Sequence, residues 1–143
     1  MAVKDYMNKF LQIDCNFSVQ EAAALMDKEG TGSALVLKNN KPIGIITERD
    51  FLRKVVAKGL DPTKLKVEDV MSAPIVTIDM DEKIKEASLL MDKNNIRRLA
   101  VVDEKGEIVG KVTAHGISRG LGFQKLKKAF TAKPRNYYVE NIR

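Results

Sequence analysis

The 143-residue chain contains one sequence pattern twice, and this repeat limits its fold more than any other feature. Residues 3–7 (VKDYM) return as residues 67–71 (VEDVM), and Thr47 later corresponds to Thr113. Over that distance the spacing between copies grows only from 64 to 66 residues. Each copy is too short to bury its apolar face well alone, so we expect two copies packed together, with related clefts between them.

The repeat divides the chain into four parts. The first copy covers residues 3–60, residues 61–66 form a linker that contains Asp61-Pro62, and the second copy covers residues 67–120. Residues 121–143 form a basic tail that we expect to be partly helical. Because the linker is short, the two copies should pack closely.

Each copy is expected to fold as strand, helix, strand, strand, helix, which makes the fold class α/β (α+β). Ser18 and Glu21 form a capping-box pattern at the start of an apolar helical face. The apolar runs 34–37 and 43–46, joined by a polar turn, predict a hairpin. In the second copy Gly116, Gly120 and Gly122 weaken the last helix.

Composition excludes several classes of protein. No apolar run approaches the roughly 20 residues of a membrane helix, and no secretory signal is visible, so we expect a cytoplasmic protein with no membrane partner. One cysteine and one histidine exclude an internal disulfide and a structural zinc site. No nucleophile–base pair, metal-binding constellation or P-loop is apparent, so no catalytic residue, metal or required cofactor is predicted.

The net charge of +6 is concentrated at the C-terminus. Residues 121–143 contain six cationic side chains and a single acid, Glu140, so the repeats are close to neutral. Such a run suits phosphates or acidic partners, although a solvated helix face is the commoner explanation.

The order of elements and several motifs resemble the tandem CBS domain family, whose paired repeats are called Bateman modules. The resemblance covers residues 3–120 and is carried by four motifs: the Val-x-Asp-x-Met opening of each copy, GIITERDFLR at 44–53, MSAP at 71–74 and NIRRL at 95–99. It implies two βαββα units related by a pseudo-twofold axis, with small sheets flanked by helices. It also implies a homodimer that senses adenine nucleotides or related adenosyl ligands.

Residues 44–50 suit a ribonucleotide on chemical grounds as well. A helix that begins after Thr47 presents free backbone N–H groups and a positive dipole end to a phosphate. Asp50 is an ionised double acceptor for both ribose hydroxyls, and Arg49 balances phosphate charge. The same Thr-x-x-acid pattern is also an ordinary helix cap. Inside a tandem repeat that forms a cleft here, we favour the nucleotide site.

The second copy differs from the first at this point. Thr113 is kept, but Gly116 stands where the first copy has Asp50, which removes the ribose acceptor. We therefore predict one competent nucleotide site per chain. His115 aligns with Arg49 and is a candidate phosphate partner with a pH-dependent charge, or simply an exposed polar residue.

The base pocket follows only from the resemblance. It places adenine between the first strand of the half that supplies Asp50 and the start of its hairpin, with one of Ile45 and Ile46 facing the core. Arg97 and Arg98 would reach the phosphate from the other half, although ordinary surface charge explains at least one of them. The candidate residues of the base pocket are Gln12, Ile13, Ser33, Ala34 and Ile46, and Arg98 is a candidate phosphate partner.

The sequence therefore predicts a non-catalytic regulatory module that binds AMP first of all, or ADP, ATP or an S-adenosyl compound, and signals to a protein partner by conformational change. The alternative is a nucleic-acid-associated or protein-interaction adaptor acting through the tail. A structural dimer with inactive clefts is a third possibility. The tail offers a helical spacing of apolar residues, and two tyrosines able to stack on bases: Phe123, Leu126, Phe130, Tyr137 and Tyr138.

Overall fold

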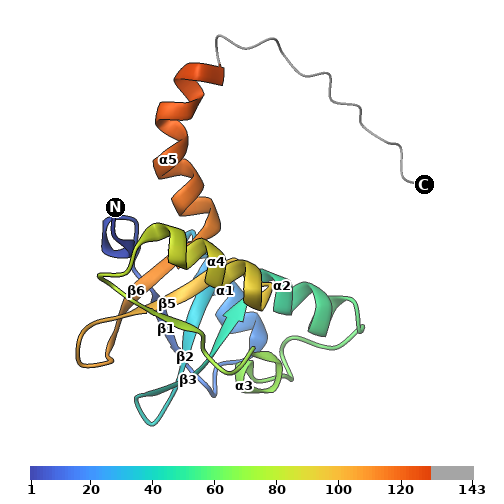
Figure 1. The fold of residues 1–143 in the computed structure, drawn as a ribbon. Coiled ribbons are helices and arrows are strands. Elements are labelled where there is room, and N and C mark those ends of the chain that lie inside the picture. The colour runs from blue at the N-terminus through green and yellow to red at the C-terminus, as the bar shows by residue number, and fades with distance from the viewer. Residues whose placement is uncertain (130–143) are drawn as a thin grey trace.

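The computed structural model describes residues 1–129, with side chains through Leu121. Each repeat folds as predicted into a small three-stranded sheet with helices around it (Figure 1). In each sheet the first strand runs parallel to the second, and the second pairs antiparallel with the third.

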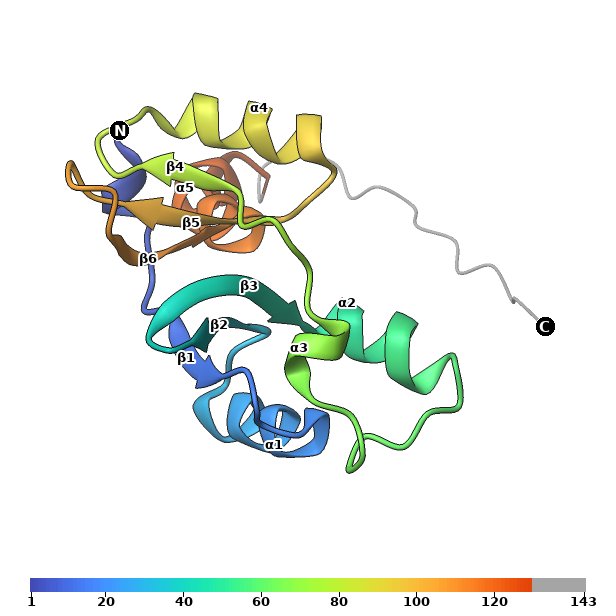
Figure 2. The same ribbon diagram turned by 90° about the horizontal axis from the view of Figure 1, so that it is seen from below.

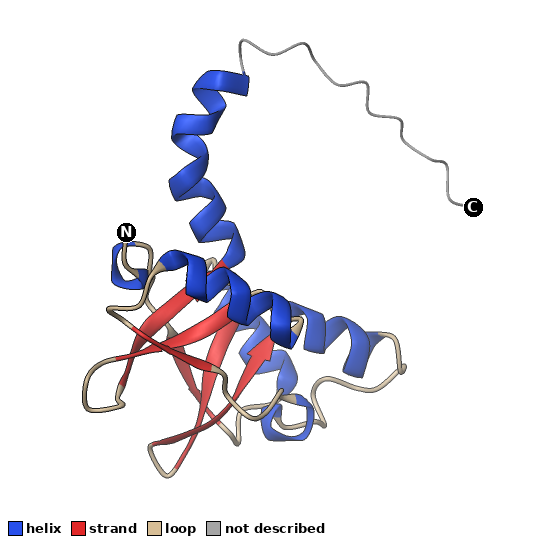
Figure 3. Cartoon of the chain, in the orientation of Figure 1, coloured by secondary structure: helices blue, strands red, loops and turns tan. Residues whose placement is uncertain are grey.

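The elements of the first repeat are η1 (Val3–Asp5), β1 (Leu11–Asp14), α1 (Val19–Glu29), β2 (Ser33–Lys38), β3 (Lys41–Thr47), α2 (Glu48–Asp50) and its π-helical continuation η2 (Phe51–Val56). Those of the second repeat are α3 (Val67–Val70), β4 (Thr77–Asp79), α4 (Ile84–Asn94), β5 (Arg98–Val102), β6 (Ile108–Thr113) and α5 (Ala114–Ala129). The strands lie together at the centre, and the helices lie outside them (Figure 3).

The predicted capping box starts α1. The Glu21 backbone N–H donates to Ser18 Oγ at 3.0 Å, and the Ser18 N–H donates to Glu21 Oε1 at 3.3 Å. The hairpin between β2 and β3 also forms, with Asn39 and Asn40 at φ of 51° and 62°. Two consecutive left-handed residues are typical of a type I′ turn, whose twist matches that of the flanking strands.

The two sheets face each other, with α1 and α4 on their outer sides (Figure 2). Between the sheets, Phe10, Leu35, Ile45 and Ala100 form an apolar cluster that joins the repeats. Because Leu35 is only 1% exposed, this cluster is part of the protein core, and the two repeats share it.

The opening segment of each repeat packs on the other repeat, as Figure 2 shows. Val3 is buried in the core of the second repeat, and its N–H donates to the Glu82 carbonyl at 2.8 Å. In the same way Val67 is buried in the core of the first repeat, and its N–H donates to the Phe17 carbonyl at 2.9 Å. The two sequence copies are therefore interleaved in space.

The last helix is longer than its glycines suggested. α5 runs without a break from Ala114 to Ala129. A Cβ at Gly120 would overlap the Tyr6 ring, so glycine allows the opening segment to pack against this helix. Packing thus outweighs the unfavourable helix propensity.

Part of the predicted tail lies beyond what the structure describes. Residues 121–129 belong to α5. The side chains of Phe123 and Leu126 lie outside the described part, as do Phe130, Tyr137 and Tyr138 entirely. Within residues 1–129, no helix is long and apolar enough to cross a membrane.

Candidate functional site

A cleft of about 660 Å³ lies between the two repeats. The first repeat contributes the end of β3 and the helix that follows it, and the second repeat contributes the segments before β4 and before β5. Its lining residues are Ile45, Thr47, Glu48, Arg49, Asp50, Arg53, Lys54, Ser72, Pro74, Val76, Asn95, Ile96, Arg97 and Arg98.

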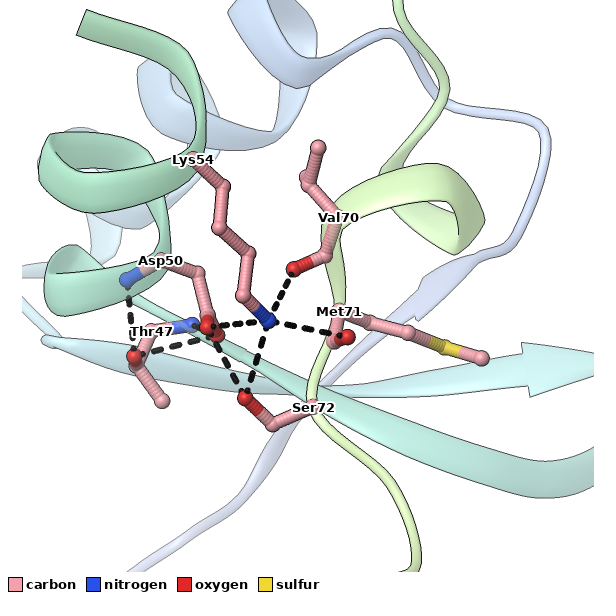
Figure 4. Close-up of polar contacts among 6 residues, drawn as sticks. All are labelled: Thr47, Asp50, Lys54, Val70, Met71 and Ser72. Carbon is pink, nitrogen blue, oxygen red and sulfur yellow. Dashed lines mark hydrogen bonds and ion pairs between the residues drawn. The ribbon is translucent and has the colours of Figure 1, made fainter. Parts of the chain in front are cut away.

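Thr47 and Asp50 form a reciprocal cap at the start of α2 (Figure 4). The Asp50 N–H donates to Thr47 Oγ1 at 3.2 Å, while the Thr47 N–H and hydroxyl donate to Asp50 Oδ2 at 3.0 and 3.1 Å. The capping interpretation of this motif is therefore correct. The same cap also points the Asp50 carboxylate at the cleft.

The second carboxylate oxygen of Asp50 interacts with two further groups (Figure 4). The Ser72 hydroxyl donates to Asp50 Oδ1 at 2.8 Å, and Lys54 Nζ lies 3.0 Å from the same oxygen. A carboxylate has about four lone-pair sites. Since Asp50 already accepts four interactions, a ribose hydroxyl could bind it only by replacing one of them.

Lys54 ties this helix to the second repeat. Its ammonium group donates to the carbonyls of Val70 and Met71 at 2.9 and 3.3 Å, as well as pairing with Asp50. Sequence reasoning missed both Lys54 and Ser72. The available signals were the i, i+4 spacing of Lys54 from Asp50 and the position of Ser72 directly after the second opening motif.

A close backbone approach brings Ser72 into the site. The Ile45 N–H donates to the Ser72 carbonyl at 3.0 Å, and the Ser72 N–H donates to the Ile45 carbonyl at 2.8 Å. A Cβ at Gly44 would lie 2.9 Å from the Ser72 carbonyl oxygen, closer than carbon and oxygen normally approach. Glycine at position 44 thus permits this approach.

The lining is rich in positive charge. It contains five cationic side chains and two carboxylates, Glu48 and Asp50. Arg98 is partly buried and donates to the Gly32 carbonyl at 3.2 Å. Burial lowers the pKa of Arg98 below its ordinary value, and the Glu48 and Asp50 carboxylates oppose that shift. Such a cleft favours an anionic ligand.

Of the residues expected from the sequence, Thr47, Arg49, Asp50 and Arg98 line this cleft together, and Arg97 joins them. The base-pocket residues do not. Gln12 lines a smaller, separate hollow, and His115 is exposed on α5. The others are buried beneath the sheets or between the repeats: Ile13, Ser33, Ala34 and Ile46.

Ile45, in place of Ile46, faces the cleft. Side chains alternate along a strand, so only one of this pair can face outward from the first repeat. Ile46 points into the core of its own repeat, whereas Ile45 lies between the sheets and at the cleft. The strand pattern predicted the alternation, but it did not show which of the two isoleucines faces the cleft.

The corresponding corner of the second repeat keeps the cap and lacks the acid. The Gly116 N–H donates to Thr113 Oγ1 at 2.9 Å, as the Asp50 N–H does to Thr47. Glycine provides no carboxylate there. The two corners therefore share a backbone geometry but differ in chemistry.

Comparison with known proteins identifies the family. The CBS domain matches this chain twice, over residues 3–57 and 67–122. The chain belongs to the CBS domain family. A CBS domain protein of unknown function from Thermoplasma acidophilum has a similar structure, with a TM-score of 0.79 at 26% identity over 92% of this chain and 75% of that one.

Another similar structure is the CBS domain pair of protein MJ0100, solved in complex with 5′-methylthioadenosine and S-adenosyl-L-methionine. It has a TM-score of 0.77 at 31% identity, covering 87% of this chain and 98% of that one. An uncharacterized protein of Methanopyrus kandleri is 42% identical over 68% of this chain and 50% of its own length. The chain spans 24–59% of the length of five curated relatives.

Proposed function

We propose that this CBS pair is a non-catalytic regulatory module that binds an adenine nucleotide in the cleft around Asp50. The observation that carries this proposal is the Asp50 carboxylate, held at the junction of the two repeats among cationic side chains. The bound adenosyl compounds of the similar MJ0100 pair support it.

The cleft offers a separate environment for each part of the ligand. Asp50 accepts a ribose hydroxyl in place of the Ser72 hydroxyl, which is the same chemical group. The Arg and Lys side chains surround the phosphate. Adenine packs against the apolar part of the lining, which consists of Ile45, Pro74, Val76 and Ile96.

The charge of the lining favours a ligand with phosphates over an S-adenosyl compound. Five cations attract the dianionic phosphate of AMP and the longer phosphate chains of ADP and ATP. A sulfonium centre would add a positive charge to a cleft that already has an excess of cations. We therefore rank AMP, ADP and ATP above S-adenosylmethionine.

Binding is coupled to conformation through Ser72 and Lys54. Both contact Asp50, and both lie at the junction with the opening segment of the second repeat. A ribose that replaces the Ser72 hydroxyl loosens the opening segment of the second repeat, which packs on the first repeat and leads into β4, and so changes the preferred arrangement of the repeats. The shift is limited by the difference in ligand affinity between the two arrangements.

Calorimetric titration with AMP, ADP, ATP and S-adenosylmethionine, at one salt concentration, tests the proposal. We expect saturable nucleotide binding and an affinity loss of at least tenfold, about 1.4 kcal/mol, in Asp50→Ala. Glu21→Ala is the matched control, because it removes the acid of an equivalent capping box far from the cleft. Absence of binding by all four ligands would refute the nucleotide site.

The predicted homodimer and protein partner remain predictions. Light scattering of the purified protein tests the first, and a homodimer would give twice the mass of one chain.

A further inference from the structure

Lys111 on β6 is the counterpart of Ile45 in the second repeat. The Lys111 N–H donates to the Asn8 carbonyl at 2.9 Å, and the Asn8 N–H donates to the Lys111 carbonyl at 2.8 Å. Ile45 makes the same pair of bonds with Ser72. Ile45 lines the Asp50 cleft. By the symmetry of the repeats, Lys111 therefore lies at the equivalent place in the second repeat, which we call the second cleft.

The Lys111 side chain extends from this position to the first repeat. Its ammonium group donates to the hydroxyls of Thr31 and Ser33, the latter at 2.8 Å, and lies 5.5 Å from the centre of the Phe10 ring. These partners belong to the first repeat, whereas Lys111 belongs to the second. The lysine is only 6% exposed.

The three partners of Lys111 all correspond to lining residues of the first cleft. Phe10 follows Asn8 by two residues, as Pro74 follows Ser72. Ser33 begins β2 and pairs with Thr47, as Arg98 begins β5 and pairs with Thr113. Thr31 precedes Ser33 by two residues, as Ile96 precedes Arg98. The lysine head thus occupies the space that in the first cleft is open to a ligand.

The lysine is held firmly in place although it has no acidic partner. Within the described residues, none of the ion pairs includes Lys111. Two hydroxyls and the face of an aromatic ring solvate its ammonium group instead. Burial, and to a lesser extent the nearby Arg98, lower the pKa of Lys111 to about 8, while the Glu48 carboxylate opposes this shift. A ligand entering here would have to displace a solvated cation from its partners.

We propose that Lys111 is a specificity-determining residue that fills the second cleft and excludes an adenosine ligand from it. Together with Gly116, which provides no ribose acceptor, it leaves one site per chain. The identity of the excluded ligand rests on the proposed function of the first cleft. The exclusion itself follows from the geometry around Lys111.

The test rebuilds the second cleft in two steps and counts ligands by calorimetry with AMP and ATP. Gly116→Asp restores only the acid, and we expect it to bind one ligand per chain, like the wild type. The double variant Gly116→Asp with Lys111→Ile gives the second cleft the counterparts of Asp50 and Ile45. We expect this variant to bind two ligands per chain. In the Asp50→Ala background we expect no bound ligand without further changes and none after Gly116→Asp is added. We expect one ligand per chain after Gly116→Asp and Lys111→Ile are both added.

Three results would overturn the proposal: two ligands bound by the wild type, two bound by Gly116→Asp alone, or no increase in the folded double variant. Circular dichroism and thermal melting establish that each variant is folded. Lys111→Met keeps the unbranched stem of lysine and replaces Lys111→Ile if isoleucine prevents folding. Loss of wild-type binding in Asp50→Ala tests the first cleft separately, so failure of either idea is distinguishable from failure of the other.

Discussion

Asp50 and Ser72 come from different repeats, and the Ser72 hydroxyl donates a hydrogen bond of 2.8 Å to Asp50 Oδ1. The proposed ribose acceptor therefore also helps to hold the opening segment of the second repeat on the first repeat. The Asp50 carboxylate thus takes part both in the proposed ligand binding and in the arrangement of the repeats. A change at either residue should affect both.

Ser72→Ala should strengthen nucleotide binding and weaken the fold. It removes a hydrogen bond that the ribose must replace, which is worth about 0.5–1.5 kcal/mol, or roughly two- to tenfold in affinity. The free energy of unfolding should fall by a similar amount. Calorimetry and urea denaturation measure the two effects, and weaker nucleotide binding would show that Ser72 contacts the ligand instead of competing with it.

Nucleotide affinity should fall as salt rises, most steeply for ATP, less for ADP and least for AMP. Added ions screen the attraction between the five cations of the cleft and the phosphates, and the attraction grows with ligand charge. Titrations at three sodium chloride concentrations measure the slopes. Equal slopes for the three nucleotides would mean that the cationic side chains do not face the phosphates.

Leu35→Ala should destabilise the fold by about 2–5 kcal/mol and also weaken nucleotide binding. Leu35 packs between the sheets, so its loss loosens the contact between repeats that shapes the cleft. Val36→Ala is the control, because Val36 points into the core of its own repeat. Chemical denaturation together with calorimetry checks this, and equal loss of binding in both variants would contradict it.

Gly120→Ala should destabilise the protein, although alanine normally stabilises a helix relative to glycine. The new methyl group would overlap the Tyr6 ring, and overpacking of this kind costs about 1–3 kcal/mol. In the Tyr6→Ala background the sign should reverse. Thermal melting of the four proteins in this cycle tests it, and a stabilised Gly120→Ala single variant would refute the packing argument.

The contribution of Lys111 to stability should grow as the pH rises from about 8. Its pKa is lowered from 10.5 to about 8 in the folded protein, so above pH 8 the unfolded chain binds more protons than the folded one. The free energy of unfolding should therefore rise between pH 8 and pH 10.5. Subtracting the Lys111→Met curve from the wild-type curve isolates this effect, and a flat difference between pH 7.5 and 10 would contradict it.

The sequence predicted those features that depend on residues close together in the chain. The Ser18–Glu21 and Thr47–Asp50 caps both formed, because a capping box is a local hydrogen-bond pattern. The order of strands and helices followed from apolar periodicity, and the repeat fixed the tandem architecture.

Features that depend on contacts between repeats were not predictable in the same way. Nothing local shows that Val3 packs on the second repeat and Val67 on the first, since either pairing buries the same apolar surface. Lys54 meets Val70 and Ser72 only because of that interleaving. The helix at Gly120 likewise depends on Tyr6, which is distant in sequence.

A structure determined with AMP bound tests the central claim most directly. We expect a ribose oxygen at hydrogen-bond distance from the Asp50 carboxylate, about 2.5–3.0 Å, in place of the Ser72 hydroxyl. The phosphate should lie among the cationic side chains of the cleft. AMP bound elsewhere, with the Asp50–Ser72 hydrogen bond intact, would contradict the proposed site.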